Sequence, residues 1–187
     1  FKKILEINNN VFLINELKYF KEKNKKALLK IDGILNDDRR IFFNEISLIE
    51  NDNKILIKDL DLNNKFKISE IGFLKLDYED RNKIYNQVEL KKNKKNYILE
   101  GNSIDASKII NKIMNSKDDD PSIFSNLSSR INVNIKKVYI DEINYMNNLS
   151  GNLNFKNNKI NNLNLQSIFS NNKKFNLSIE TNNKNEK

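Results

Sequence analysis

The feature that most constrains the fold is a two-residue alternation of apolar and polar side chains in the last third of the chain. Leu149, Gly151, Leu153 and Phe155 occupy one side of this alternation, and Ser, Asn and Lys residues occupy the other. Successive side chains of an extended strand point to opposite faces, so the pattern predicts a strand with one apolar face. The pair Asn157-Asn158 then predicts a tight hairpin turn, because Asn tolerates positive φ.

The same unit of strand, turn and strand recurs about every ten residues. Two further strands are predicted on either side of a second turn at Asn171-Asn172. Their apolar positions are Leu163, Leu165, Phe175, Leu177 and Ile179. Upstream, Val133 and Ile135 alternate in the same way, but Val138 has the opposite parity, so a bulge or turn is expected near Lys136-Lys137.

The middle of the chain predicts an antiparallel meander, with polar joints between short apolar runs. A first strand begins at Ala27, and Gly33 is a position at which it could bend or bulge. Further strands are predicted at Arg40–Glu50, Lys54–Leu62, Lys65–Glu79, Lys83–Lys91 and Lys95–Gly101.

Two segments have helical rather than two-residue spacing. Asn10–Lys23 predicts a short amphipathic helix, and Ser103–Met114 a second one with Asp105 or Ser103 as its N-terminal cap. Their apolar faces would consist of Leu13, Leu17 and Phe20 in the first helix and Ile109, Ile110 and Ile113 in the second.

A polar stretch, Asn115–Asn126, follows the second helix and contains the only proline, Pro121. Its three adjacent aspartates, Asp118 to Asp120, lack the glycine-bearing pattern of a calcium loop, so we interpret them as part of a solvated linker. The expected organisation is therefore an N-terminal helical or connecting segment (1–26), a β-meander (27–101), a short helix with a linker (102–128) and hairpin repeats that continue the same sheet (129–187). The expected fold class is mainly β, an antiparallel meander forming an open curled sheet with one or two short helices.

Composition removes several classes of function. The chain has no Cys and no His, which excludes thiol nucleophiles, disulfides, Cys/His zinc sites and histidine acid–base chemistry. Carboxylates such as Asp59, Asp61, Asp77, Glu79 and Asp80 occur in charged joints typical of solvated surface. No nucleophile-elbow or phosphate-loop pattern is present, so we expect no catalytic activity, no cofactor and no metal.

The net charge of +8 is spread through every segment together with Asn and Ile. Nucleic-acid binders gather their basic residues into patches, so we expect no nucleic acid partner. No run approaches the roughly 18 apolar residues of a membrane-spanning helix. The chain starts at Phe1 and ends in a polar tail, and we expect it to be an excerpt from a longer polypeptide, with any membrane anchor outside it.

A sheet of this kind needs a cover for its apolar face. In a sandwich the cover is a second sheet, whereas in an open sheet it can be a bound lipid chain, and the alternation is the same in both cases. The two-residue period therefore leaves both possibilities open.

Three segments resemble the C-terminal repeats of the AsmA-like superfamily, in particular its YhdP-type members. They are IDGILNDDRRIFFNEISL from Ile31, YILEGNSIDASKIINKI from Tyr97 and VNIKKVYIDEINYMNNLSGNLNFKNNKINNLNLQSIFSNNKKFNLSIE from Val133. The similarity lies in spaced hydrophobic and small residues, such as Leu149, Gly151, Leu153 and Phe155 in a strand of the family's "l-x-G-x-l-x-f" type. The chain differs from the family in having only four glycines, with Asn at many turns.

This resemblance implies a long β-groove anchored in the inner membrane and extending through the periplasm, as in the related TamB. Phospholipid acyl chains would move along its apolar interior between the inner and outer membranes, supporting the integrity of the bacterial envelope. The expected lining residues are Leu153, Phe155, Leu163, Leu165, Phe175, Leu177 and Ile179. The alternative for each is that it packs in an ordinary core, as in a purely structural β-repeat or stalk with a filled interior and no ligand.

Overall fold

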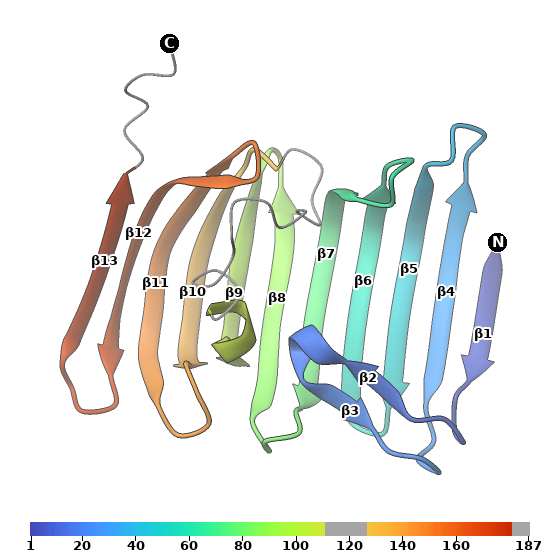
Figure 1. Ribbon diagram of the computed structural model, residues 1–187, viewed down its shortest axis with the longest axis horizontal. Coiled ribbons are helices and arrows are strands. Elements are labelled where there is room, and N and C mark those ends of the chain that lie inside the picture. Colours follow the sequence, from blue (N-terminus) through green and yellow to red (C-terminus); the bar gives the residue numbers. More distant parts are fainter. Residues whose placement is uncertain (111–126, 181–187) are drawn as a thin grey trace.

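The alternating segments pair side by side to form one open sheet of eleven strands in the computed structural model, which describes residues 1–110 and 127–180 (Figure 1). The order across the sheet is β1-β4-β5-β6-β7-β8-β9-β10-β11-β12-β13, and β2 and β3 form a separate two-stranded hairpin. The strands are β1 (Lys2–Glu6), β2 (Phe12–Ile14), β3 (Tyr19–Lys21), β4 (Leu28–Leu35), β5 (Ile41–Glu50), β6 (Asn53–Leu62), β7 (Ile68–Glu79), β8 (Tyr85–Asn93), β9 (Asn96–Asp105), β10 (Arg130–Tyr139), β11 (Tyr145–Lys156), β12 (Lys159–Phe169) and β13 (Lys174–Glu180). The mainly β, open-sheet prediction is confirmed, and each strand predicted between Arg40 and Gly101 is present within a few residues.

One neighbouring pair departs from the predicted antiparallel meander. β9 and β10 are parallel, with Leu99 opposite Val133 and Ile104 opposite Val138. Parallel neighbours cannot be joined by a tight hairpin and need a longer crossover connection, which here includes a helical turn at residues 107–110. The sheet is therefore mixed, since all its other neighbouring strands are antiparallel.

The helix predicted at Asn10–Lys23 is wrong. This segment forms β2, a 3-10 turn at Asn15–Leu17 and β3, and Lys18 takes a left-handed conformation with φ 50° at the end of the turn. Across the hairpin Phe12 pairs with Lys21, Leu13 with Phe20 and Ile14 with Tyr19. β-Branched and aromatic residues fit a pleated surface, and packing against the main sheet overrides the weak helical spacing.

The second predicted helix begins later than expected. Strand β9 continues to Asp105, and helix is found at residues 107–110. The Asp105 carboxylate accepts a hydrogen bond from the Ser107 backbone N–H at 2.9 Å, so its predicted capping role is confirmed. Ile113, Met114 and the polar stretch Asn115–Asn126 lie outside the described residues.

Turns and irregularities fall where Asn and Gly predict them. Asn157 and Asn158 have φ of 51° and 66°, the left-handed values that a tight hairpin turn requires. The register between β4 and β5 shifts at Asp32/Gly33, which confirms the bulge. Near Lys136 the pairing is interrupted, opposite Asn148 with its φ of 54°.

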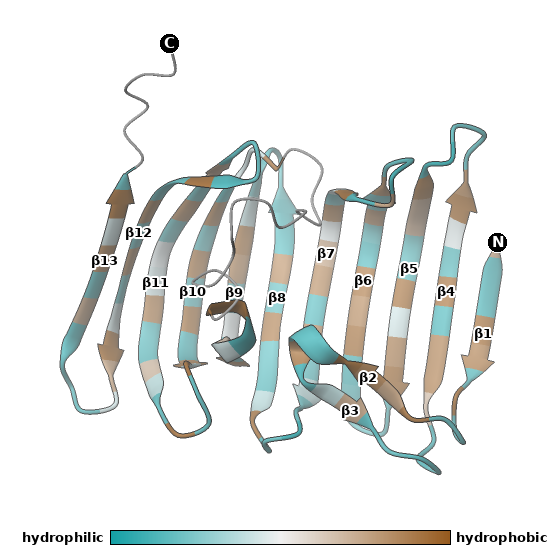
Figure 2. Cartoon of the chain, in the orientation of Figure 1, coloured by the Kyte–Doolittle hydropathy of each residue, from teal (hydrophilic) through white to brown (hydrophobic). Residues whose placement is uncertain are grey.

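Hydropathy changes along each strand in short bands, as expected from a sheet with two different faces (Figure 2). The hairpin and the helical turn lie over the same face of the sheet (Figure 1). Beneath the hairpin, Tyr19 and Tyr78 pack edge to face with ring centroids 5.5 Å apart, and both are 1% exposed. This aromatic pair belongs to a buried cluster that continues to Val133, Ile135 and Val138 on β10.

Candidate functional site

The seven residues expected to line a groove lie on one face of the sheet. Leu163 of β12 stands opposite Leu153 of β11 and opposite Ile179 of β13, and Leu165 stands opposite Leu177. Directly opposed residues of a ladder point to the same side. Phe155 follows Leu153 by two residues and Phe175 precedes Leu177 by two, so alternation places both on this side as well.

Their burial differs within this set. Leu163 is 6% exposed, whereas Leu177 and Ile179 are 37% and 45% exposed. Phe175 packs edge to face against Phe169, with ring centroids 5.6 Å apart. Apolar side chains on the outermost of these strands, β13, therefore remain in contact with water.

The same face continues without a break across the whole sheet. A single row of directly opposed residues crosses all eleven strands, and only its glycine and its terminal lysine are not aliphatic. The row runs Leu177, Leu165, Gly151, Val133, Leu99, Leu90, Leu74, Ile57, Ile46, Ile31 and Lys3. We call the side of the sheet that carries this row the apolar face.

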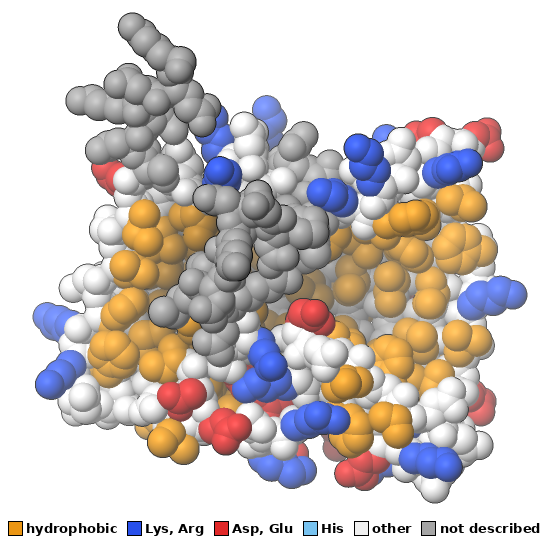
Figure 3. All heavy atoms as spheres, in the orientation of Figure 1, with side chains coloured by type: hydrophobic (Ala, Val, Ile, Leu, Met, Phe, Trp, Pro, Cys, Tyr) orange, Lys and Arg blue, Asp and Glu red, His pale blue; other side chains and the backbone are white. Residues whose placement is uncertain are grey.

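A second row of the apolar face lies two residues further along each strand. It runs Leu149, Ile135, Gly101, Val88, Leu76, Ile55, Leu48, Leu29 and Leu5. Figure 3 views this face and shows hydrophobic side chains gathered over β4–β7 and again over β11–β13. The groove candidates at β11–β13 are thus one end of a larger apolar surface.

The opposite side, which we call the polar face, carries charged and amide side chains. One of its rows runs Ser178, Asn164, Asn152, Asn132, Ile98, Lys91, Phe73, Lys58, Glu45, Asp32 and Lys2. In the N-terminal half of the sheet these charges form ion pairs, for example Lys30 with Glu45 at 2.9 Å and Lys91 with Glu89 at 2.8 Å. The hydrogen bonds from these lysines lower the pKa of Glu45 and of Glu89 below the ordinary value.

The hairpin covers part of the apolar face and is held there by buried polar contacts. The Tyr19 hydroxyl donates to Glu50 and the Tyr78 hydroxyl donates to the Leu17 carbonyl, both at 2.6 Å. Burial is the main cause that raises the pKa of both tyrosines above the ordinary value. Lys21, which is fully buried, donates from Nζ to three backbone carbonyl oxygens.

A further ion pair joins the hairpin to the sheet. Lys18 Nζ lies 2.6 Å from the Asp105 carboxylate, whose side chain is 2% exposed. Burial alone would raise the pKa of Asp105, but the hydrogen bonds from Lys18 and Ser107 hold it below the ordinary value. Nearby Asp80 accepts backbone N–H bonds from Asn82 and Ile84, and burial raises its pKa. The Lys18–Asp105 pair and the two tyrosine hydrogen bonds fix the hairpin over part of the apolar face.

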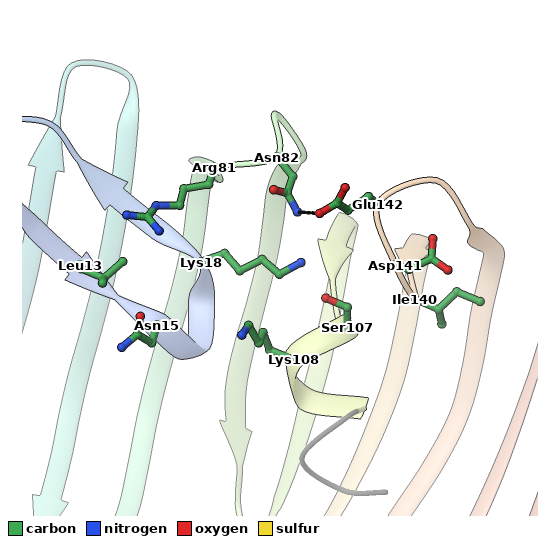
Figure 4. Close-up of a pocket in the computed structure, with 10 residues that line it drawn as sticks. All are labelled: Leu13, Asn15, Lys18, Arg81, Asn82, Ser107, Lys108, Ile140, Asp141 and Glu142. Atoms are coloured by element: carbon green, nitrogen blue, oxygen red, sulfur yellow. Dashed lines mark hydrogen bonds between the residues drawn. The ribbon is translucent and has the colours of Figure 1, made fainter. Parts of the chain in front are cut away.

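A polar cavity of about 420 Å³ lies between the hairpin, the loop after β7 and the helical turn (Figure 4). Its lining carries both signs of charge, with Arg81 and Lys108 on one part and Asp141 and Glu142 on another. Glu142 accepts a hydrogen bond from Asn82 at 3.2 Å. Its mixed, hydrogen-bonded lining distinguishes this cavity from the apolar face.

The sequence also contained the signal for the N-terminal part of the apolar face. Ile55 and Ile57 on β6, and Leu74 and Leu76 on β7, show the same two-residue alternation as the C-terminal repeats. Their pairing across the sheet depends on register, which alternation within one strand does not reveal. The sequence therefore predicts these residues as strand positions and does not place them in the candidate site.

Neither a metal site nor a membrane-spanning helix emerges from residues 1–110 and 127–180. No cluster of three or more acidic side chains suited to a metal ion occurs within these ranges, and no helix there is long and apolar enough to cross a bilayer. Comparison of the chain with protein-family models, with curated proteins and with solved structures finds no match.

Proposed function

We propose that the chain is a segment of a periplasmic hydrophobic groove that carries phospholipid between the inner and outer membranes of bacteria. The observation that supports this most directly is the unbroken apolar row from Leu177 to Ile31, which crosses ten strands of one open sheet. Val133 in this row is buried and the hairpin covers part of the face, but the other side chains of the row remain partly exposed. A monomeric soluble domain rarely leaves an apolar surface of this extent without a partner. The likeness to YhdP-type repeats gives the proposal its cellular setting.

The dimensions of the apolar face suit acyl chains. Neighbouring strands are about 4.8 Å apart, so the nine spacings between ten strands span about 43 Å. One leaflet of a bilayer contributes about 15 Å of hydrocarbon, half of a core roughly 30 Å thick. The row is thus long enough for an acyl chain to lie along it and to move to a neighbouring position.

The energetics favour binding without a fixed site. Each methylene removed from water contributes about 0.8 kcal/mol, so half of an acyl chain gains several kcal/mol on the apolar face. Between Leu177 and Ile31 the row offers only aliphatic side chains and one glycine, with no hydrogen-bonding side chain to hold a lipid at one position. Headgroups would remain in water at the rim, which permits sliding.

A second candidate function is that of a structural β-repeat with a filled interior. The hairpin favours it, because Tyr19 and Tyr78 fill the space above β6–β8 with protein side chains. This reading predicts that neighbouring chain segments also cover the surface at β11–β13, where Leu177 is 37% exposed.

Site-specific photocrosslinking distinguishes the two functions. A photoreactive residue replaces Leu165, Leu177 or Ile57 on the apolar face, and Asn164, Asn176 or Lys58 on the polar face as the adjacent control. The protein is irradiated in cells and with phospholipid vesicles, and attached lipid is identified by mass spectrometry. Lipid adducts at the apolar positions alone are expected. Adducts at neither set in a folded protein would reject lipid carriage and favour the filled repeat.

A further inference from the structure

The polar cavity of Figure 4 carries opposite charges that do not pair with one another. Lys108 lines it from the helical turn, and Glu142 lines it from the loop between β10 and β11. Neither side chain makes an ion pair within residues 1–110 and 127–180. Charged groups that face one cavity without neutralising each other can bind a ligand that carries both charges.

A buried hydroxyl in the same lining lacks a partner. Ser107 is 6% exposed, and its Oγ makes no hydrogen bond within the described part of the chain. Buried polar atoms nearly always have a partner, so this hydroxyl is free to donate to a ligand. Figure 4 shows it directed toward the side chain of Lys18, whose ammonium holds Asp105 and has further hydrogens to donate. An anionic oxygen between them would accept from both groups.

The cationic and acidic groups of the lining come from different elements. The hairpin and the helical turn supply Lys18 and Lys108, and the loop after β10 supplies Asp141 and Glu142. Asp141 already accepts hydrogen bonds within its own loop, so Glu142 is the carboxylate with an open oxygen. The volume of about 420 Å³ falls within the roughly 300–1,000 Å³ of small-molecule sites. A phosphoethanolamine group matches this lining, because a short ethylene link separates its phosphate from its ammonium.

An apolar row connects the rim of the cavity with the exposed end of the sheet. Ile140, which lines the cavity, lies two residues beyond Val138 of the buried cluster. Val138 stands opposite Met146, and Met146 stands opposite Phe169. Phe169 in turn packs against Phe175 of β13. A lipid held here by its headgroup would therefore have its acyl chains beside the apolar face.

We propose that the cavity binds a phosphoethanolamine group, with the phosphate near Ser107 and Lys108 and the ammonium near Glu142. Phosphate oxygens accept hydrogen bonds from hydroxyl and ammonium groups, and a primary ammonium donates to a carboxylate. Assigning this group to a phospholipid headgroup rests on the proposed function. The same group in a soluble phosphodiester has the same chemistry, so the experiments below separate the two sources.

Titration with glycerophosphoethanolamine, which carries the headgroup without acyl chains, tests the cavity itself. Binding is followed by NMR through the amide shifts of the cavity residues. Lys108→Gln and Glu142→Gln remove opposite charges, yet each should weaken binding by about threefold to tenfold. Lys95→Gln, in the exposed turn between β8 and β9, is the matched control and should leave binding unchanged.

Two results of this titration would overturn the proposal. The first is the absence of binding to the original chain. The second is a Glu142→Gln variant that binds as tightly as the original chain or more tightly, which is the behaviour of a site for a simple anion.

Ser107→Ala separates binding from folding. The hydroxyl has no partner within the described residues, so its removal should leave the midpoint of chemical denaturation unchanged. Binding of glycerophosphoethanolamine should weaken by about threefold. A lowered midpoint with unchanged binding would assign the hydroxyl to the fold and overturn its place in the site.

Vesicles distinguish the lipid headgroup from the soluble group. The chain is incubated with vesicles of phosphatidylethanolamine and phosphatidylglycerol in equal amounts, and the lipid that it retains is identified by mass spectrometry. Phosphatidylethanolamine should be enriched, and Glu142→Gln should abolish the enrichment. Equal retention of both lipids would reject the headgroup site and leave lipid carriage intact. Retention of neither lipid, with glycerophosphoethanolamine still bound, would reject lipid carriage and support a site for the soluble group.

Discussion

The N-terminal and C-terminal parts of the sheet carry the same apolar alternation but bury it to different degrees. On β5, β7 and β8, Leu48, Leu76 and Val88 are 3–4% exposed, because the hairpin lies over the adjacent surface and its Tyr19 packs on Tyr78 of β7. On β13, Leu177 and Ile179 remain 37% and 45% exposed. An identical strand pattern therefore becomes core in one region and an open surface in the other, and the difference comes from a covering segment distant in sequence.

The polar faces of the two regions differ as well. β4 to β9 are linked by lysine–carboxylate pairs, such as Lys75 with Glu89 at 3.3 Å. β10 to β13 oppose Asn and Ser residues, with Asn132, Asn152 and Asn164 in successive positions of one row. The first region thus combines buried apolar positions on β5, β7 and β8 with a polar face of paired charges. The second combines exposed apolar positions on β13 with a polar face made mainly of amide and hydroxyl side chains.

The largest expected effect on stability comes from removing the contact between the hairpin and the sheet. Tyr78→Ala removes a 1% exposed aromatic ring, its edge contact with Tyr19 and its hydrogen bond to the Leu17 carbonyl. We expect the free energy of unfolding, measured by chemical denaturation, to fall by about 3–5 kcal/mol, as for other buried aromatic residues.

Tyr78→Phe is the matched control for this change. It keeps the ring and removes only the hydroxyl, so the expected loss is about 1 kcal/mol. If the two variants lost the same stability, the ring would not be the main contribution of the hairpin contact.

The next effect concerns the C-terminal strands alone. Gly151 of β11 has φ 142°, and a Cβ added there would overlap the carbonyl oxygen of Asn164 on β12. Gly151→Ala should therefore cost about 1–3 kcal/mol of backbone strain. Hydrogen exchange should show lost amide protection in β11 and β12 with little change in β5 to β7. Asn152→Ala, a change at the neighbouring residue on the polar face, should leave amide protection intact. Equal loss of protection in β11–β12 and in β5–β7 would contradict the prediction that the strain stays within the C-terminal strands.

A smaller effect is a difference in pH response between the polar face of β4–β9 and that of β10–β13. The folded-state pKa of Glu45 and of Glu89 is lowered mainly by lysine hydrogen bonds, so their contribution to stability is present above the ordinary value of 4.5. It is lost as the pH falls through the folded-state values, and because the pairs are partly exposed it amounts to about 0.2–1 kcal/mol for each.

Carboxyl NMR titration measures both pKa values directly. Lys30→Gln removes the partner of Glu45 and should return its pKa toward 4.5 while leaving Glu89 unchanged. A Glu45 pKa that does not respond to this variant would mean that the ion pair does not form in solution.

Local pattern was sufficient to predict most strands, two of the Asn turns, the bulge at Gly33 and the shared face of Leu153 to Ile179. These features depend on residues within one strand or one hairpin, which alternation and turn chemistry report directly. The extent of the apolar face was not predicted, because the row from Leu177 to Ile31 exists only once nine registers between neighbouring strands are fixed.

Two differences between the prediction and the structure have a common physical origin. Asn10–Lys23 was predicted as a helix from three apolar residues, and the sheet was predicted as antiparallel throughout, whereas its β9–β10 pair is parallel. In both cases the outcome depends on contacts distant in sequence: the hairpin forms against the main sheet, and the parallel pair follows a crossover. Tertiary packing of this kind overrides a short local pattern.

The smallest expected effect on stability addresses what the open region is for. Leu177 is 37% exposed, so Leu177→Ala should lower the free energy of unfolding by no more than about 0.5 kcal/mol. Denaturation at several protein concentrations separates this cost from any contribution of chain association. If the exposed surface binds acyl chains, the same variant should lose about 1 kcal/mol of contact and bind phospholipid about fivefold more weakly. If the variant affects lipid binding more than stability, Leu177 belongs to a lipid-binding surface. A loss of several kcal/mol in the free energy of unfolding with unchanged lipid binding would instead place Leu177 in a filled core.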